Sequence, residues 1–247
     1  MNDSLAMNIK YFDRLESTNN YCKLLDLANV GEFTVIVARS QTGGIGQRGN
    51  VWVSEPYKNL TFSLILKPIF LTASEQYRMT MTLATAMAMT VQQLLPVETV
   101  KIKWPNDIYV GDRKICGILT TCNIKSDHIA EAICGIGLNV NQEVFPDWVP
   151  NPTSLKIVTH RDHNTDEVLS TALANIESQY RLLSEDYDSI EADYLNLMYQ
   201  RGERHKYDYR GEIIEATIET VNRYGHLQLR TADGTFISCD IKEIRFL

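Results

Sequence analysis

Four extended segments follow one another between residues 100 and 140, and their connections are too short to hold a helix. The segments are 100–104, 107–110, 114–122 and 130–140. Strands joined by short turns, such as the Gly-Asp-Arg turn at 111–113, pair antiparallel, because a parallel pair needs a crossover of about a dozen residues or more. This stretch therefore predicts an antiparallel sheet.

Strands and helices occupy separate runs in the rest of the chain. Strands are predicted at 33–38 and 60–66, where β-branched and apolar residues cluster. One helix is predicted over 74–95, with its methionines on the face that packs into the core, and two more between 168 and 197. Because regular strand–helix–strand alternation is scarce, the expected fold class is α+β, with a mixed, largely antiparallel sheet flanked by helices.

The polar run at 200–206 marks a change in pattern. Beyond it, short alternating segments are separated by turn signals at 224–225 and 233–234, which predicts a small β-meander or barrel. A module of about 45 residues lies near the lower limit for independent folding, so we expect it to lean on the main domain. The expected domains are residues 1–200 and residues 201–247.

Composition excludes several classes of protein. The net charge of −7 argues against a nucleic-acid footprint spread over the surface. No stretch approaches the roughly 18 consecutive apolar residues of a membrane span, and the run MNDS at the start has no signal-peptide pattern. The five cysteines form no C-x-x-C pair. We therefore expect a cytoplasmic protein with reduced thiols that binds neither nucleic acid nor membrane.

A glycine-rich loop follows the strand at 33–38. Its glycines are Gly43, Gly44, Gly46 and Gly49. Such a loop lets the backbone approach a ligand and can offer successive N–H groups to an anion, although a flexible surface turn explains glycine clustering equally well. Arg48 adds a guanidinium suited to phosphate or carboxylate, and Trp52 can stack on a base. No Gly-Lys-Ser/Thr follows and no amphipathic helix opens here, so this is neither a Walker loop nor a Rossmann fingerprint.

The run KIKWPND, which begins at Lys101, combines a charged strand with an irregular corner. Lys101 and Lys103 are two residues apart and share one face of the strand, which a solvated surface also explains. Pro105 breaks the strand and leaves Asn106 and Asp107 on the corner. Four residue types with specific side-chain chemistry in one corner favour a functional site.

Two further strands carry small or polar residues at informative places. Lys114 opens a strand directly after a turn, and Gly117 interrupts that strand. A glycine inside a strand indicates either close approach of another group or a β-bulge. The run GIGLNVN at 135–141 ends the next strand with two amides. Each of these signals is weak when taken singly.

Together and in this order, the motifs resemble the biotin–protein ligase family. The matching runs are DRLESTN at 13–19, the glycine-rich loop, KWPND at 103–107, KICGIL at 114–119, GIGLN at 135–139 and PTSL at 152–155. The resemblance covers most of residues 10–200. It implies a sheet like that of class II synthetases and biotin ligases, and the C-terminal meander resembles the family's small SH3-like domain.

The resemblance implies a reaction in two steps. Biotin and Mg-ATP form biotinyl-5′-adenylate and pyrophosphate, and a lysine of a biotin carboxyl carrier protein then attacks the adenylate and releases AMP. The implied enzyme is a biotin–[acetyl-CoA-carboxylase] ligase that uses ATP and Mg²⁺. Both a monomer and a homodimer remain open.

The resemblance also carries roles onto individual residues. Lys114 would press the biotin carboxylate and the α-phosphate together, with Arg48 and Lys103 as further cations. The expected contacts to biotin and nucleotide are Ser17, Thr18, Asn19, Gln41, Gly44, Ile45, Gly46, Gln47, Trp52, Asn106, Asp107, Gly117 and Asn139. Among them, Asp107 is the candidate ligand for the metal.

One departure from the family pattern lies in the glycine-rich loop. The family's loop commonly reads Gly-Arg-Gly-Arg, and here Ile45 and Gln47 stand at the arginine positions. A lost hydrogen bond to a charged group costs roughly 1.5–3 kcal/mol, which is about tenfold to a hundredfold in affinity. We therefore expect the adenylate to be held less tightly.

Two alternatives to the expected function stay open, and a role as a repressor is not expected. A lipoate or octanoyl ligase shares the fold, but the KWPND run and the C-terminal meander weigh against it. A weakly active paralogue that only binds biotin or a carrier protein stays open because of the arginine losses. The Ser-Thr-Asn motif begins at residue 17 and leaves no room before it for a DNA-binding winged helix, so we expect a ligase that is not a repressor.

Overall fold

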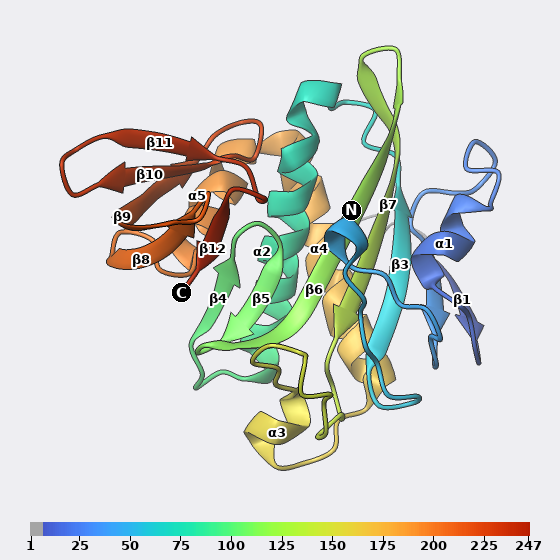
Figure 1. Ribbon diagram of the computed structural model, residues 1–247. Coiled ribbons are helices and arrows are strands. Elements are labelled where there is room, and N and C mark those ends of the chain that lie inside the picture. The colour runs from blue at the N-terminus through green and yellow to red at the C-terminus, as the bar shows by residue number, and fades with distance from the viewer. Residues whose placement is uncertain (1–6) are drawn as a thin grey trace.

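Seven strands form one mixed sheet in the computed structural model, which describes residues 7–247 (Figure 1). Their order across the sheet is β1-β2-β3-β7-β6-β5-β4. The strands are Asn8–Phe12 (β1), Thr34–Ala38 (β2), Leu60–Leu66 (β3), Val100–Lys103 (β4), Asp107–Val110 (β5), Arg113–Lys125 (β6) and His128–Leu138 (β7). Strands β1 and β2 are parallel and every other neighbouring pair in this sheet is antiparallel. The expected α+β class is confirmed.

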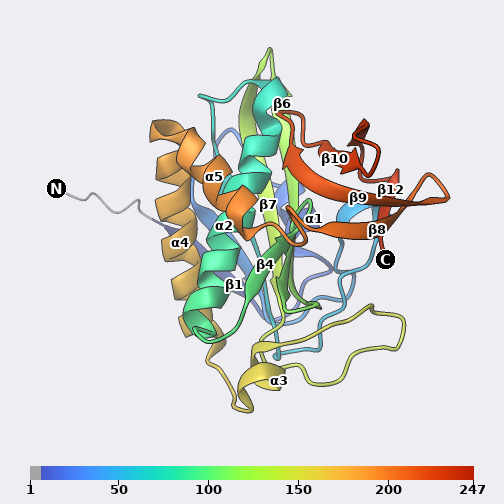
Figure 2. The same cartoon turned by 90° about the vertical axis from the view of Figure 1, so that its left-hand side faces the viewer.

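Helices lie on both faces of this sheet, except for the short α3, which lies beyond one end of the strands (Figure 1). They are Thr18–Lys23 (α1), Gln76–Leu94 (α2), Leu155–Thr159 (α3), Thr165–Glu185 (α4) and Tyr187–Leu197 (α5), with 3-10 turns at Gln47–Gly49 and Ala73–Glu75. Helices α2, α4 and α5 lie together on one face (Figure 2), where Met79 and Met87 of α2 are fully buried, as expected for core packing. Helix α1 lies on the other face, where Cys22 packs with Ile36 and Ile133.

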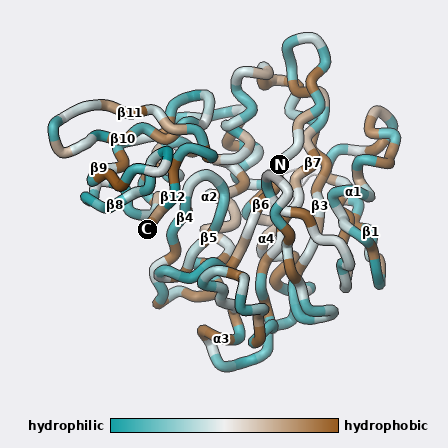
Figure 3. Tube along the Cα trace, viewed as in Figure 1, coloured by the Kyte–Doolittle hydropathy of each residue, from teal (hydrophilic) through white to brown (hydrophobic). Residues whose placement is uncertain are grey.

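The C-terminal part forms a second sheet of five strands in the order β11-β10-β9-β8-β12. The strands are Arg204–Tyr209 (β8), Glu212–Val221 (β9), Leu227–Thr231 (β10), Phe236–Cys239 (β11) and Ile244–Phe246 (β12). All neighbours are antiparallel. Both hydrophobic and hydrophilic residues occur in this sheet (Figure 3), and β8 is hydrophilic along its whole length. This arrangement is compatible with the expected SH3-like fold, while the domain limits at residues 200 and 201 stay a prediction.

One turn of the small sheet docks against the larger part of the molecule. Gly225, between β9 and β10, has φ +88°, and a Cβ there would lie 2.3 Å from the ring of Tyr77 on α2. The Gly225 carbonyl accepts a 3.0 Å hydrogen bond from Trp104 Nε1. Pro105 follows Trp104 in the sequence, and its carbonyl accepts a 2.9 Å hydrogen bond from the Tyr194 hydroxyl of α5. The small sheet and α5 therefore both hold the corner between β4 and β5.

Candidate active site

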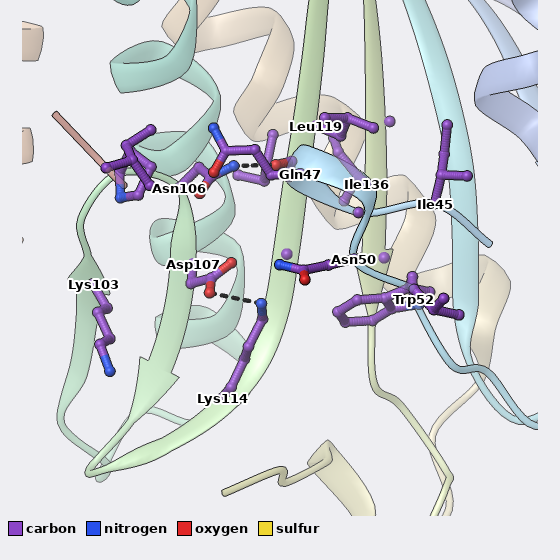
Figure 4. Close-up of a pocket in the computed structure, with 18 of the residues that line it drawn as sticks. Ile45, Gln47, Asn50, Trp52, Lys103, Asn106, Asp107, Lys114, Leu119 and Ile136 are labelled. Carbon is purple, nitrogen blue, oxygen red and sulfur yellow. Dashed lines mark hydrogen bonds and ion pairs between the residues drawn. The ribbon is translucent and has the colours of Figure 1, made fainter. Parts of the chain in front are cut away.

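A cavity of ≈ 440 Å³ lies between the glycine-rich loop, the middle of the large sheet and the end of the chain (Figure 4). The predicted site residues that line it are Ser17, Thr18, Asn19, Gln41, Ile45, Gly46, Gln47, Trp52, Lys103, Asn106, Asp107, Lys114 and Gly117. Gly44 and Asn139 are not among the described lining residues. The side chain of Arg48 lies outside the described part of the structure. Most of the predicted residues are thus brought to one place.

Lys114 reaches into this cavity from the start of β6 (Figure 4). Its Nζ lies 2.6 Å from a carboxylate oxygen of Asp107, and each of the two side chains is 28% exposed. The same nitrogen lies 5.8 Å from the centroid of the Trp52 ring. The ammonium group and the glycine-rich loop therefore face one cavity. At the two loop positions where the family commonly has arginine, this chain has the uncharged residues Ile45 and Gln47.

The glycine-rich loop folds back on itself as a short hairpin. The N–H of Gly46 donates to the Asn50 carbonyl at 2.7 Å, and the N–H of Gly43 donates to the Glu16 carbonyl at 2.8 Å. The expectation that successive glycine N–H groups of this loop face an anion is therefore wrong for Gly43 and Gly46. Both donors are used to close the loop and to hold it against the segment before α1.

Trp52 explains why two paired positions of the sheet are glycines. Gly117 of β6 and Gly137 of β7 are directly opposite each other. A Cβ at Gly137 would lie 2.3 Å from Cε2 of the Trp52 ring, and one at Gly117 would lie 3.0 Å from Cζ3. The irregularity in β5–β6 pairing falls between Ile108 and Tyr109 rather than opposite Gly117. Of the two explanations for Gly117, close approach is correct, and the group that approaches is Trp52.

The Ser-Thr-Asn motif forms the buried, uncharged end of the cavity. Ser17 is the N-cap of α1, and its Oγ accepts a 3.4 Å hydrogen bond from the N–H of Asn20, the usual reason for a serine at this position. The N–H of Thr18 donates to Oε1 of Gln41 at 2.8 Å, which joins the motif to the glycine-rich loop. The hydroxyl of Thr18 accepts from Ser63 Oγ on β3 at 2.8 Å. The fold itself therefore supplies hydrogen-bond partners for Ser17 and Thr18.

Three buried polar atoms at the cavity have no hydrogen-bond partner within the described residues: Asn19 Oδ1, Asn19 Nδ2 and Trp52 Nε1. Asn19 lies against bare backbone, since a Cβ at Gly135 would be 3.1 Å from its Nδ2. Nearly all buried polar groups in folded proteins are hydrogen-bonded. These atoms therefore mark where a ligand with both donors and acceptors fits.

Asn106, Asn139 and Gly44 are tied into the framework around the cavity. The amide of Asn106 donates to the Ile118 carbonyl, across the β5–β6 pair. Asn139 Nδ2 donates at 2.9 Å to the carbonyl of residue 153, which anchors the segment before α3. The Gly44 carbonyl accepts from the N–H of Trp52 at 3.0 Å, inside the loop hairpin. Contact of these residues with a nucleotide stays a prediction.

Lys103 lies at the C-terminal side of the cavity among aromatic rings. Its Nζ is 4.9 Å from the ring centroid of Phe246 and 5.0 Å from that of Tyr109. The pKa of Lys103 lies below its ordinary value, mainly because the side chain is buried. The negative charge of Asp107 raises this pKa in part, and the positive charge of Lys114 lowers it. The protein thus holds two ammonium groups near each other, an arrangement that an anionic ligand relieves.

The end of the chain supplies a wall of the cavity that the sequence did not predict. Its contributors are Ile241, Ile244, Arg245 and Phe246. Arg245 pairs with Asp208 at 3.0 Å and is 74% exposed at the rim. No motif marks these residues, because only the docking of the small sheet brings them to the site. The sequence runs that resemble the biotin–protein ligase family end at residue 155, well before these residues.

The charged residues of the cavity fit a metal that arrives with phosphate. Among the lining residues whose side chains are described, Asp107 is the one carboxylate, and Lys103, Lys114 and Arg245 are cationic. The described residues contain no group of three or more His, Cys, Asp or Glu able to hold a metal ion. Mg²⁺ in nucleotide sites is bound through one or two carboxylates plus substrate phosphates. Asp107 fits that pattern, and a cage made of protein ligands alone does not.

Residues 11–139 match the Biotin/lipoate A/B protein ligase family. The chain belongs to this family. It is similar to the bifunctional ligase/repressor BirA of Bacillus subtilis, with 33% identity over 180 residues, or 72% of this chain and 55% of that protein.

Two further similarities are informative. The biotin–[acetyl-CoA-carboxylase] ligase of Paracoccus denitrificans is 30% identical over 131 residues, covering 51% of this chain and 52% of that one. The biotin protein ligase of Aquifex aeolicus in complex with biotin and ATP superposes with a TM-score of 0.81 at 25% identity, covering 97% and 98% of the two chains. The chain spans about half the length of the curated relatives named here. Within residues 7–247, no helix is long and apolar enough to cross a membrane.

Proposed function

We propose that the protein activates biotin with ATP to biotinyl-5′-adenylate and transfers biotin to a lysine of a carrier protein. The observation that carries this proposal is that one cavity has a cationic part and an uncharged polar part. Lys103, Lys114 and Arg245 form a cationic part suited to a carboxylate and a triphosphate. Asn19, buried and without a partner within the described residues, lies in an uncharged part suited to a neutral ureido ring.

The cavity supplies what adenylate formation requires. The biotin carboxylate oxygen attacks the α-phosphorus and pyrophosphate leaves, so two anionic groups have to approach closely. A fixed ammonium group at their meeting point offsets the repulsion, and it acts more strongly in a site shielded from water. Lys114 is held for this task by Asp107, which is the one described carboxylate of the lining. A magnesium ion bound with ATP would neutralise further phosphate charge beside Asp107.

The named relatives support the same proposal. The Aquifex aeolicus enzyme was solved with biotin and ATP, and the Paracoccus denitrificans relative is named for acetyl-CoA carboxylase. We extend this to the present chain and propose a biotin carboxyl carrier domain of acetyl-CoA carboxylase as the acceptor. The five cysteines are free, which fits a reducing compartment and supports a cytoplasmic location.

Exchange of labelled pyrophosphate into ATP tests the proposed first step. The assay is run with biotin, with lipoate and with neither. We expect exchange that depends on biotin and Mg²⁺, followed by labelling of a carrier domain when one is added. Lipoate-dependent exchange would instead favour the lipoate ligase. Biotin binding in calorimetry without any exchange would show a binding protein and contradict the proposal.

A further inference from the structure

The ammonium group of Lys103 lines the cavity from the end of β4 and, among the described residues, has no carboxylate as an ion-pair partner (Figure 4). Within the same residues its Nζ donates one hydrogen bond, at 3.4 Å to the hydroxyl of Tyr109. Asp107 lies directly opposite Lys103 in the β4–β5 pair, but its carboxylate pairs with Lys114 at 2.6 Å. Buried charges are normally paired, so Lys103 keeps a charge that an anionic ligand can pair.

Three aromatic rings surround this ammonium group. Its nitrogen lies 5.0 Å from the ring centroid of Tyr109, 6.0 Å from that of Tyr199 and 4.9 Å from that of Phe246. The face of an aromatic ring attracts a cation within about 6 Å of its centroid. We call these three residues the aromatic cage. The cage attracts the charge of the lysine without placing a carboxylate against it.

The rings of the aromatic cage come from separate parts of the chain and lie in a row. Tyr109 belongs to β5, Tyr199 follows α5, and Phe246 belongs to β12. The ring centroids of Tyr109 and Tyr199 are 5.6 Å apart, and those of Tyr199 and Phe246 are 6.4 Å apart. The row therefore joins the large sheet to the last strand of the small sheet.

Two rings of the cage are anchored by contacts outside it. The N–H of Tyr199 donates to the Ile102 carbonyl of β4 at 2.9 Å, and its hydroxyl donates to Oδ1 of Asp112 at 2.6 Å. The ring of Phe246 packs edge-to-face on that of Tyr207, with 5.4 Å between the centroids, and Tyr207 is fully buried. Because the fold fixes these rings, the rings define one place for the ammonium group.

We propose that the three residues of the aromatic cage are positioning residues, which hold the ammonium group of Lys103 in place for the phosphates of ATP. This inference rests on the proposed function and deepens it. Lys114 is already ion-paired at the reacting centre. The caged ammonium group has no such partner among the described residues, so its charge is the one that a triphosphate can pair directly.

The cage acts by ordering the lysine before ATP arrives. Without the ring faces, the flexible four-carbon stem of Lys103 would let the ammonium group turn toward Asp107 or toward water. Binding of ATP would then have to order the side chain again, which costs conformational entropy. The ureido ring of biotin would lie in the uncharged part of the cavity around Asn19. Loss of the cage should therefore weaken ATP binding and leave biotin binding nearly unchanged.

The test weakens the face of one ring while nearly keeping its shape. Phe246 is replaced by phenylalanine that carries one, two or three fluorine atoms on the ring, because fluorine withdraws electron density from the face. Phe246→Leu removes the ring. Phe236→Leu is the matched control, since Phe236 belongs to β11 of the same sheet, is 71% exposed and does not line the cavity. For each protein, the KM for ATP is measured in biotin-dependent pyrophosphate exchange and the Kd for biotin by calorimetry.

We expect the KM for ATP to rise stepwise with the number of fluorine atoms. In Phe246→Leu it should rise by about twofold to thirtyfold, the range that one cation–π contact supplies. The Kd for biotin should stay close to the unmutated value, and Phe236→Leu should match the unmutated protein in both constants. A ring that only fills space would give no graded response, because the fluorinated rings have nearly the same shape.

Two further sets of variants show whether the rings act through the lysine. In the Lys103→Met protein the KM for ATP should be raised and should no longer depend on fluorination at residue 246. At the second ring, Tyr109→Phe keeps the face and removes the hydroxyl that accepts from Lys103. It should raise the KM for ATP less than Tyr109→Leu does.

Other outcomes would overturn the inference. An unchanged KM for ATP across the fluorinated series would show that the ring face does not position the ammonium group. A KM that falls with fluorination would show that the ammonium group leaves the rings to bind phosphate. A graded response that persists in Lys103→Met, or an equal loss of biotin affinity, would assign the ring to another role. Absence of biotin-dependent exchange in the unmutated protein would contradict the proposed function itself, and the inference with it.

Discussion

Trp52 occupies the space that a side chain at residue 137 would fill. Gly137→Ala would place a Cβ 2.3 Å from Cε2 of this indole, so the ring has to move away from the sheet. Overpacking of this kind costs about 1–3 kcal/mol of unfolding free energy. We expect a lower Tm and weaker biotin binding, measured by thermal denaturation and calorimetry.

Gly31→Ala is the matched control for this change, because its Cβ would have Thr34 Oγ1 at 3.9 Å as its nearest neighbour. The double variant Gly137→Ala/Trp52→Phe should recover part of the lost stability, since a smaller ring leaves room for the methyl group. If Gly137→Ala denatured like the Gly31→Ala control, the proposed contact would not constrain the sheet.

Gln47 lines the cavity at one of the two positions where the family's loop commonly has arginine. A guanidinium there would add a charged hydrogen bond to the adenylate. We expect Gln47→Arg to slow dissociation of biotinyl-AMP by about tenfold to a hundredfold. Dissociation is measured by filtration after a chase, with Gln47→Met as the uncharged control. Unchanged retention in Gln47→Arg would contradict this account of the loop.

At the scale of elements, the strands and helices with strong patterns were predictable. The hairpin strands β5, β6 and β7 and helix α2 appear where the sequence places them. Strand β1 was not predicted, because four of its five residues are exposed and no core-facing alternation remains. Helix α1 has six residues, too few to show a helical period, although Ser17 is a good N-cap. Short and exposed elements owe their structure to neighbours rather than to their own pattern.

The turn between β9 and β10 makes a prediction at this scale. Gly225 and Gly234 both have φ +88°, but only at Gly225 would a Cβ meet another group, the ring of Tyr77. Alanine at either position costs on the order of 1–2 kcal/mol for the left-handed backbone. In Gly225→Ala the new methyl group would also push the turn away from Tyr77, so we expect the hydrogen bond from Trp104 Nε1 to the carbonyl of residue 225 to be lost.

We therefore expect Gly225→Ala to reduce pyrophosphate exchange more than Gly234→Ala does, because the Trp104–Pro105 corner leads directly to Asn106 and Asp107. Exchange is measured well below the Tm of both variants. Equal exchange in the two would show that the docked turn does not position this corner.

At the scale of the whole molecule, the site is built from parts that lie far apart in the sequence. The motifs predicted one wall of the cavity, the one made by Ser17, Lys103 and Lys114. They did not predict Arg245 or Phe246, because these reach the cavity only after the small sheet has docked. They also did not predict that Trp52, rather than a ligand, fills the space above the glycines. The sequence motifs therefore identify the chemically active side chains of the site. Which further side chains line the cavity depends on how the small sheet and Trp52 pack.

The central claim is that the ammonium group of Lys114 offsets the repulsion between the biotin carboxylate and the α-phosphate of ATP when both lie in one cavity. The most direct test compares Lys114→Met with the unmutated protein in biotin-dependent pyrophosphate exchange, with biotin affinity measured by calorimetry on the same samples. Loss of a charge at the reacting centre is expected to lower exchange by about a hundredfold or more, while biotin affinity changes far less. Exchange at the unmutated rate in Lys114→Met would contradict the account.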